Sequence, residues 1–386
     1  MQKINMSSIP FSLPDIGTEE IEEVIDTLKS GWLTTGPKVK KFEEDFVDYI
    51  DQNVNAIAVN SATAGLHLAL EALGIKEGDE VIVPSLTFTA TAGVVRHIGA
   101  EVKLVDIDPI TLNINSNSIR DSITPKTKAI ILVHYAGLSC DMDEILLLAK
   151  SFELKVIEDA SHALSSSYKG NSIGSLKSDA TVFSFYANKT MTTGEGGMVI
   201  TRDASLASRI KIMRLHGIDR DVFNRFQSTR PSWYYEVIAP GFKYNMTDIA
   251  AAIGIHQLRK LPKFLEIRQK LAARYLSELS DLPIILPANS NDRVHAWHLF
   301  VIRLNQDVKI SRDELIEYLS KKNIGTSVHY NPLHRQPYWR DRYKLTSEMF
   351  PESEKAYQTM VSIPLYTLMS PEQQDHIIDS LRNVLR

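Results

Sequence analysis

Short apolar runs alternate with amphipathic stretches over the first half of this chain. The runs predict buried strands, and the stretches between them carry apolar residues at helical spacing. The predicted strands are 56–59, 80–83, 102–105, 129–134, 155–158, 180–185 and 198–201, and the predicted helices between them are 64–73, 87–98, 116–122 and 142–152. This alternation predicts an α/β domain with a largely parallel sheet.

The pattern differs at the two ends of the chain. Two amphipathic helices, 18–30 and 39–49, precede the first strand, and Thr18 is expected to cap the first of them. After a long predicted helix over 261–279, the expected elements are a strand at 297–303, a helix at 312–321 and a strand at 326–330.

A final helix is predicted from Ser370, because Pro371 and Gln373 complete a strong start signal. The last third of the chain therefore predicts a smaller α+β domain. We expect a large domain over residues 1–255, including the N-terminal helical segment, and a small domain over 256–386.

Composition narrows the class of protein. The chain has 386 residues, a net charge of −4 and a single cysteine, Cys140. A negative net charge does not indicate a nucleic-acid-binding surface. A single cysteine cannot form a disulfide within the chain, which is consistent with a reducing compartment. The N-terminal stretch lacks the apolar core of a signal peptide, and the apolar runs are too short to span a bilayer. We expect a cytoplasmic protein that does not bind membranes.

Polar side chains that could bind a ligand or react with one fall at the carboxyl ends of the predicted strands, where α/β sheets bind ligands. Lys189 follows the apolar run 181–187 and precedes the small-residue loop 192–197. Burial at such a point lowers the pKa of an amine and makes it a nucleophile towards carbonyl groups. A solvated surface lysine is the ordinary alternative.

Asp159 ends another predicted strand. A lysine and a carboxylate on two strand ends of one sheet are what a pyridoxal phosphate (PLP) site needs, because the carboxylate keeps the pyridine nitrogen protonated. A helix cap or a metal ligand is the alternative for Asp159. His162 either contacts the cofactor phenol oxygen or packs in the core, and Phe88 either stacks on the cofactor ring or packs in the core.

The segment 60–65 joins a predicted strand to a helix with hydroxyl groups and free backbone N–H groups, which suits a phosphate or a plain helix cap. The sequence has neither a GxGxxG motif after the first strand nor a P-loop motif. It therefore does not favour a dinucleotide-binding protein or a P-loop nucleotide-binding protein. The histidines His295, His298, His329 and His334 do not have the spacing of a compact zinc site, so no metal is expected, and they are predicted to be substrate contacts or solvated surface residues.

Taken together, these pieces resemble the DegT/StrS-type family of PLP-dependent nucleotide-sugar aminotransferases, especially its 4-amino-sugar-forming members. The resemblance covers nearly the whole chain. Its motifs are 31–37, 60–66, 78–84, 133–137, 158–160, 183–185, 194–197 with Lys189, 241–248, 295–298 and 327–330. The stretch 220–233 matches none of them and is expected to form a loop over the site.

The resemblance implies a fold-type I aminotransferase with a mostly parallel mixed sheet, assembled as a homodimer with shared active sites. Lys189 would bind PLP covalently, Asp159 would pair with the pyridine nitrogen, and His162 would lie near the phenol oxygen. Further cofactor contacts are implied for Thr63, Ala64 and Ser184 at the phosphate, Asn245 of the partner subunit beside them, and Phe88 on the ring. The implied border of the nucleotide-sugar pocket is Thr34, Thr35, His329 and Tyr330.

The implied reaction moves an amino group from L-glutamate to a keto group of a nucleotide-linked sugar for cell-surface polysaccharide or lipopolysaccharide synthesis. C4 and UDP are the first expectations, while C3, dTDP and GDP stay open. One family branch carries histidine in place of the lysine and dehydrates its sugar, whereas this chain keeps Lys189. A PLP-dependent sugar dehydratase or lyase, or a non-catalytic PLP-binding regulator, remains the alternative.

Overall fold

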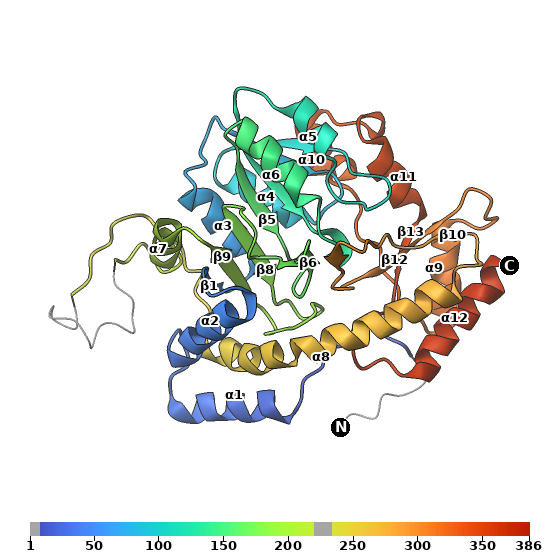
Figure 1. Cartoon of the computed structure of the whole chain (residues 1–386), viewed down its shortest axis with the longest axis horizontal. Coiled ribbons are helices and arrows are strands. Elements are labelled where there is room, and N and C mark those ends of the chain that lie inside the picture. The colour runs from blue at the N-terminus through green and yellow to red at the C-terminus, as the bar shows by residue number, and fades with distance from the viewer. Residues whose placement is uncertain (1–7, 220–233) are drawn as a thin grey trace.

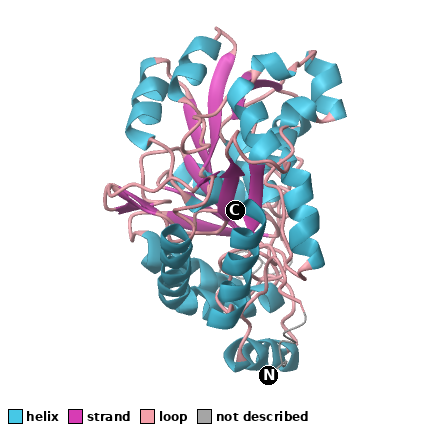
Figure 2. Ribbon diagram, turned by 90° about the vertical axis from the view of Figure 1, so that its right-hand side faces the viewer, coloured by secondary structure: helices cyan, strands magenta, loops and turns pink. Residues whose placement is uncertain are grey.

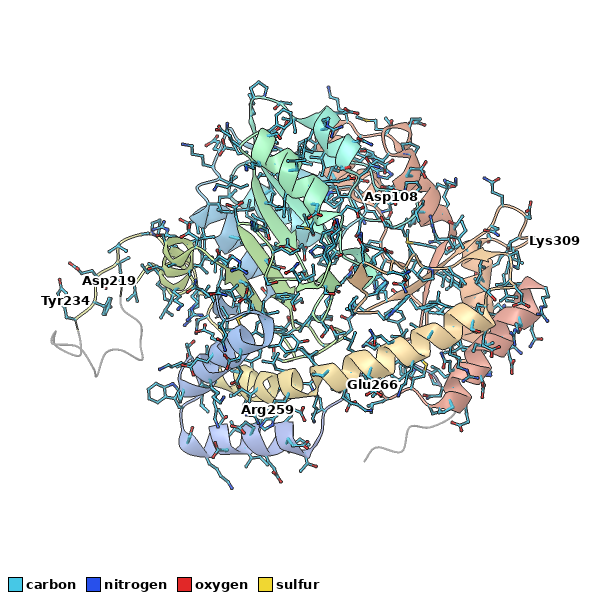
Figure 3. All side chains as sticks on the ribbon, in the orientation of Figure 1. Asp108, Asp219, Tyr234, Arg259, Glu266 and Lys309 are labelled. Carbon is cyan, nitrogen blue, oxygen red and sulfur yellow. The ribbon has the colours of Figure 1, made fainter. Side chains whose placement is uncertain are left out.

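A seven-stranded mixed sheet forms the centre of the protein (Figure 1). The computed structural model describes residues 8–219 and 234–386, and Asp219 and Tyr234, labelled in Figure 3, border the gap between the two ranges. The loop expected at 220–233 lies outside the described residues.

The strand order is β1-β9-β8-β5-β4-β2-β3, with β9 antiparallel to both of its neighbours and the other pairs parallel. The strands are β1 (Asn55–Val59), β2 (Glu80–Pro84), β3 (Glu101–Val105), β4 (Thr127–Val133), β5 (Lys155–Asp159), β8 (Ala180–Ser184) and β9 (Gly197–Thr201). All seven predicted strands are therefore present, and the predicted α/β class with a mostly parallel sheet is confirmed.

Helices cover both faces of this sheet (Figure 2). Successive side chains of a strand point to opposite faces, so Val182 of β8 joins one hydrophobic core and Phe183 joins the other. The covering helices are α2 (Pro37–Ile50), α5 (Ser116–Ser122) and α6 (Met142–Ser151) in the core with Phe183, and α3 (Ala62–Ala72), α4 (Thr89–His97) and α7 (Ala204–Met213) in the core with Val182.

The first helix, α1 (Thr18–Ser30), lies beside the long helix α8. The expectation that Thr18 caps it is wrong, because Gly17 holds the cap position and no side chain there can accept a hydrogen bond. The Glu20 carboxylate instead reaches back and accepts from the Gly17 N–H at 2.8 Å. Because glycine has no side chain to cap the helix, the hydrogen bond from the Gly17 N–H to Glu20 is the remaining local signal for the helix start.

Helix α8 (Asp248–Glu278) crosses the lower edge of the molecule in Figure 1 and joins its two parts. Ile255 and Phe264 lie in the core against the large sheet, whereas Ala272 and Tyr275 lie in the core of the C-terminal part. The predicted start at residue 261 is wrong, because Thr247 caps the helix and Pro262 lies inside it. The helix runs unbroken through residue 255, so the domain division proposed there stays a prediction.

The C-terminal part is built on a three-stranded sheet in the order β10-β12-β13. Its core holds side chains from α8, α9 and α12, among them Leu319 and Leu381. The elements are β10 (Ile284–Ile285), β12 (Phe300–Leu304), α9 (Arg312–Lys321), α10 (Pro337–Tyr343), α11 (Pro351–Thr359), β13 (Met360–Ile363) and α12 (Pro371–Leu385). A second small sheet joins β11 (Arg293–Val294), β6 (Ser167–Tyr168) and β7 (Asn171–Ser172), which links the two parts.

Two strand predictions in this part need correction. The strand expected at 297–303 begins only at Phe300, because Trp297 has a left-handed backbone with φ 51°. The segment expected as a strand at 326–330 makes a single isolated bridge, between Ser327 and Ser362. Helices α10 and α11 and strand β13 were not predicted. Within residues 8–219 and 234–386, none of the helices is long and apolar enough to cross a membrane.

The cap of α12 provides a test of the local start signals. Ser370 accepts from the Gln373 N–H at 3.2 Å, and Gln373 accepts from the Ser370 N–H at 3.0 Å. We expect Ser370→Ala to lower the free energy of unfolding by about 1 kcal/mol. Thr18→Ala, at the exposed first position of α1, should change it by less than about 0.5 kcal/mol. Denaturant unfolding of both variants measures the difference, and equal losses would contradict the assignment of the two caps.

Candidate active site

One cavity of about 410 Å³ opens at the carboxyl ends of the large sheet. Val133, Asp159 and Ser184, the last residues of β4, β5 and β8, all line it. The C-terminal part closes the cavity with the side chains of His298, His329 and Tyr330. Ligand contacts therefore come from both parts of the chain, as is usual for open α/β sheets.

Lys189 lies in the turn that follows β8, and its N–H donates to the Tyr186 carbonyl at 3.0 Å. Its side chain is partly buried and lines the cavity. Burial lowers the pKa of the Lys189 amine to about 8, although the nearby Asp159 carboxylate partly opposes this shift. An appreciable fraction of the amine is therefore neutral, and nucleophilic, near neutral pH.

Asp159 is buried at the end of β5 and is held on both carboxylate oxygens. The Thr91 hydroxyl donates to Oδ2 at 2.8 Å, and the hydroxyl and N–H of Ser161 donate to Oδ1 at 2.6 and 3.2 Å. These bonds fix the direction of a carboxylate that lines the cavity. The orientation suits an acceptor for a protonated ring nitrogen, and neither a cap nor a metal ligand role is seen.

A buried hydrogen-bond network lies behind Asp159. His134 Nδ1 accepts from the Cys140 N–H at 3.0 Å, so its Nε2 carries the hydrogen and donates to Glu158 at 2.7 Å. The other oxygen of Glu158 accepts from the Thr181 hydroxyl at 2.9 Å. This network joins the ends of β4 and β5 to Thr181 near the start of β8, and it holds β5, which carries Asp159, beside β8, which leads to Lys189.

The N-terminus of α3 enters the cavity with Ser61, Ala62 and Thr63. Ser61 caps this helix by accepting from the Ala64 N–H at 3.1 Å, while the first N–H groups of a helix have no partner within it. A Cβ atom on Gly197 would lie 2.8 Å from the Ala62 nitrogen, so only glycine lets β9 approach the helix start this closely. The result is a small pocket of backbone donors that fits a phosphate group.

His162 forms a defined pair with Tyr330. Its Nδ1 accepts from the Ala136 N–H at 3.3 Å, so Nε2 carries the hydrogen and donates to the Tyr330 hydroxyl at 2.9 Å. Burial and the charge of Lys189 keep the pKa of His162 well below its ordinary value. The Tyr330 hydroxyl, which burial keeps protonated by raising its pKa, has its own hydrogen left to donate towards a ligand.

Most of the residues expected in the site line the cavity: Thr63, Phe88, Asp159, His162, Ser184, Lys189, His329 and Tyr330. Phe88 is exposed, and its ring centroid lies 5.8 Å from that of Tyr330, which places it at the mouth rather than in the core. Ala64 is buried in α3 and does not line the cavity.

The remaining three expected residues form a separate cluster. The Asn245 amide donates to the Thr35 hydroxyl oxygen at 2.7 Å, and the Thr35 hydroxyl donates to the Met246 carbonyl at 2.6 Å. The Thr34 carbonyl accepts from the Asp248 N–H at 3.1 Å. This Thr34–Thr35–Asn245 cluster is not part of the cavity that contains Lys189 in the same chain.

Sequence reasoning did not single out the cavity residues Tyr186, Asn188 and Ser161, and it named His298 only as a substrate contact or a surface residue. The hydroxyl of Ser161, two positions after Asp159, is a recognisable local signal for a hydrogen bond to that carboxylate. Tyr186 and Asn188 lie in the same turn as Lys189, so their closeness to it in the sequence was a usable signal, whereas tertiary packing brings His298 to the cavity. Within the described ranges, no group of histidine, cysteine and carboxylate side chains is arranged to hold a metal ion.

Comparisons with known proteins agree with this geometry. The model of the DegT/DnrJ/EryC1/StrS aminotransferase family matches residues 14–382. The chain is 45% identical over 381 residues to the spore coat polysaccharide biosynthesis protein SpsC of Bacillus subtilis, covering 98% of this chain and 97% of that one. It is 50% identical over 384 residues to the uncharacterised protein MJ1066 of Methanocaldococcus jannaschii, covering 99% of each.

Among solved structures, the sugar aminotransferase Spr1654 of Streptococcus pneumoniae in its PLP form aligns with a TM-score of 0.90 and 34% identity, covering 98% of both chains. The fold and site thus define a PLP-dependent sugar aminotransferase of fold type I. This chain belongs to the DegT/DnrJ/EryC1/StrS aminotransferase family. The expected cofactor and enzyme class are confirmed.

The lowered pKa of Lys189 can be measured in the cofactor-free protein. The protonated amine is unreactive, so the rate of covalent attachment of PLP should rise with pH around a midpoint of about 8. Stopped-flow absorbance at a series of pH values gives this midpoint, and Lys189→Arg, which cannot bind PLP covalently, is the control. A midpoint near 10.5, the ordinary value for lysine, would show that Lys189 is not desolvated.

The close approach of β9 to α3 can be tested with alanine. The Cβ atom of Gly197→Ala would meet backbone atoms, so the start of α3 must shift. We expect a loss of about 1–3 kcal/mol in the free energy of unfolding and at least a tenfold weaker affinity for PLP. Gly93→Ala, at a helical position with nothing within 4 Å, is the matched control. Unchanged PLP affinity in Gly197→Ala would argue against this phosphate pocket.

Proposed function

We propose that the protein transfers the amino group of L-glutamate to a keto group of a nucleotide-linked sugar. C4 is the proposed position and UDP the proposed nucleotide, and the product serves cell-surface polysaccharide or lipopolysaccharide synthesis in the cytoplasm. The observation that carries the proposal is that the desolvated Lys189 amine, the Asp159 carboxylate and the start of α3 all line one cavity. The similarity to a spore coat polysaccharide biosynthesis protein supports the choice of pathway.

When bound, PLP supplies an electron sink for the substrate carbon next to the amine. The residues of the chain hold it and move protons. Asp159 accepts a hydrogen bond from the ring nitrogen, and the N–H groups at the start of α3 bind the phosphate. Once free, the amine of Lys189 takes the proton from the substrate carbon and returns one later, and its pKa of about 8 suits both steps.

We further propose that the enzyme is a homodimer with shared sites. The Thr34–Thr35–Asn245 cluster is held together by its own hydrogen bonds and does not line the cavity of its own chain. An assembly that brings this cluster to the neighbouring cavity would place Asn245 of the partner subunit beside the phosphate. It would also place the two threonines beside the sugar nucleotide.

The absorption spectrum tests the reaction directly. The PLP-loaded protein should show a band at the edge of the visible range, and L-glutamate should bleach it with release of one 2-oxoglutarate per site. A UDP-linked 4-keto sugar should then restore the band, whereas 3-keto sugars and dTDP- or GDP-linked sugars should restore it more slowly. Lys189→Ala should reduce turnover by at least about a hundredfold, because the positioned proton carrier is gone.

The same assay separates the alternatives. Ammonia release in place of an amino-sugar product would identify a lyase or dehydratase, and a stable band that no amino donor or keto sugar changes would identify a binding protein. Full transaminase activity in Lys189→Ala would contradict the assigned role of this residue.

A further inference from the structure

His298 is a buried histidine in the cavity that the proposed reaction does not use. Its side chain lines the cavity, yet only 5% of the residue is exposed. Its Nδ1 is enclosed and has no hydrogen-bond partner among the described residues, so Nε2 is the nitrogen left to face the cavity. The imidazole ring lies against that of His162, with 4.5 Å between the centroids.

The backbone around His298 is held in place from both parts of the chain. The Leu299 N–H donates to the Ala136 carbonyl at 3.2 Å, and the buried Arg268 donates to the Trp297 carbonyl at 3.0 Å. A Cβ on Gly137 would lie 3.2 Å from the His298 nitrogen, which shows how closely the two segments approach. The ring is therefore fixed next to His162 rather than free to find a partner elsewhere.

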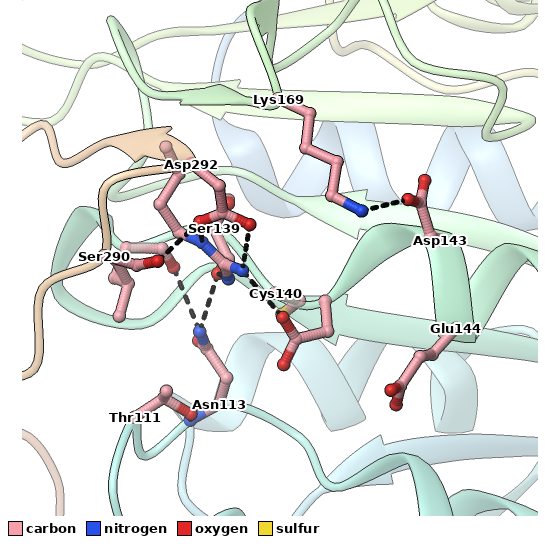
Figure 4. Close-up of polar contacts among 12 residues, drawn as sticks. Thr111, Asn113, Ser139, Cys140, Asp143, Glu144, Lys169, Ser290 and Asp292 are labelled. Carbon is pink, nitrogen blue, oxygen red and sulfur yellow. Dashed lines mark hydrogen bonds and ion pairs between the residues drawn. The ribbon is translucent and has the colours of Figure 1, made fainter.

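Further contacts hold the residues that adjoin these two segments, 138–141 and 292–293 (Figure 4). Asn113 donates to the carbonyls of Leu138 and Ser139, and Arg293 donates to the Ser139 carbonyl at 2.9 Å. Arg293 is in turn paired with Asp292 and Asp141. A ligand in the cavity cannot reach the enclosed Nδ1, so any hydrogen bond that a ligand makes to His298 must be made at Nε2, the nitrogen left to face the cavity.

We propose that His298 binds both substrates in turn: the α-carboxylate of the amino donor, and the hydroxyl group next to the keto carbon of the sugar. The inference rests on the proposed function. In a two-step transfer the reacting carbons of donor and acceptor occupy the same place near Lys189. Substituents next to those carbons therefore meet the same part of the cavity wall, where one residue can bind both.

A neutral imidazole suits this double task better than a cation. Burial, together with the nearby His162 and Lys189, lowers the pKa of His298 well below its ordinary value. Neutral histidine donates one hydrogen bond and can also accept one, according to its tautomer. A guanidinium would be left as an unpaired buried charge whenever the sugar occupied the site. Within the described ranges, no arginine lines the cavity.

Three substitutions at His298 and one control test the proposal in the PLP-loaded enzyme. His298→Phe removes both nitrogens, His298→Gln places an amide near the position of Nε2, and His298→Asn places one near Nδ1. The matched control is His334→Gln, because His334 is also buried with an unpartnered Nδ1 but does not line the cavity.

The readouts are KM for glutamate, KM for the keto sugar, and calorimetric affinities for glutarate and UDP, neither of which reacts. We expect His298→Phe to weaken glutarate binding and raise both KM values by about 10- to 100-fold. His298→Gln should recover more of this loss than His298→Asn. UDP affinity, the PLP absorption band and the behaviour of His334→Gln should stay unchanged.

An effect of His298→Phe on only one of the two substrates would overturn the shared role, as would unchanged values for both. Parallel losses in UDP affinity and the PLP band would show a structural role instead. Failure of the wild-type enzyme to aminate any nucleotide-linked keto sugar would instead overturn the proposed function. In that case the glutarate titration alone decides whether His298 binds carboxylates.

Discussion

The end of β5 is the point on which the rest of the site depends. Glu158 is fully buried there and accepts hydrogen bonds from His134 on β4's side and from Thr181 on β8. Removing one partner of such a buried set leaves an uncompensated polar group, so the ends of β4 and β5 and the start of β8 are held in one arrangement. Asp159, the next residue, points to the other face and into the cavity. Two neighbouring residues of one strand thus have different tasks. Glu158 holds the strands together, and this fixes the position of Asp159 in the cavity.

The sequence was sufficient to predict the large sheet, because its strands are nearly continuous apolar runs separated by helical stretches. It was also sufficient for Lys189, Asp159 and Ser61, since parallel topology brings strand ends to one edge regardless of detailed packing. The cap of α12 was predictable for a similar reason: Ser370 and Gln373 interact only with each other's backbone. In each case the information lies within a few residues of the feature that it determines.

The features that the sequence did not predict depend instead on contacts between residues that are far apart in the sequence. Helix α8 continues through Pro262 because side chains on both sides of it, such as Leu258 and Phe264, are buried in the large core, and this tertiary packing outweighs a local helix breaker. His298 belongs to the cavity only because the segment 296–299 is bonded to Ala136 and Gly137, which lie far away in the sequence. No local pattern encodes such contacts, so a single sequence could not place them.

Two opposing effects set the protonation state of Lys189 in the cavity. Burial drives the Lys189 amine towards its neutral form, while Asp159 opposes it, and the pKa of about 8 is the result. Additional carboxylates near the amine would hold it protonated, and a guanidinium would repel the protonated form altogether. His162, His298 and His329 instead have pKa values lowered by burial and by Lys189, so they supply hydrogen-bonding nitrogens without charge at neutral pH. A wall of neutral imidazoles therefore lets one lysine alternate between proton donor and nucleophile without disturbing the Asp159 carboxylate that the ring nitrogen requires.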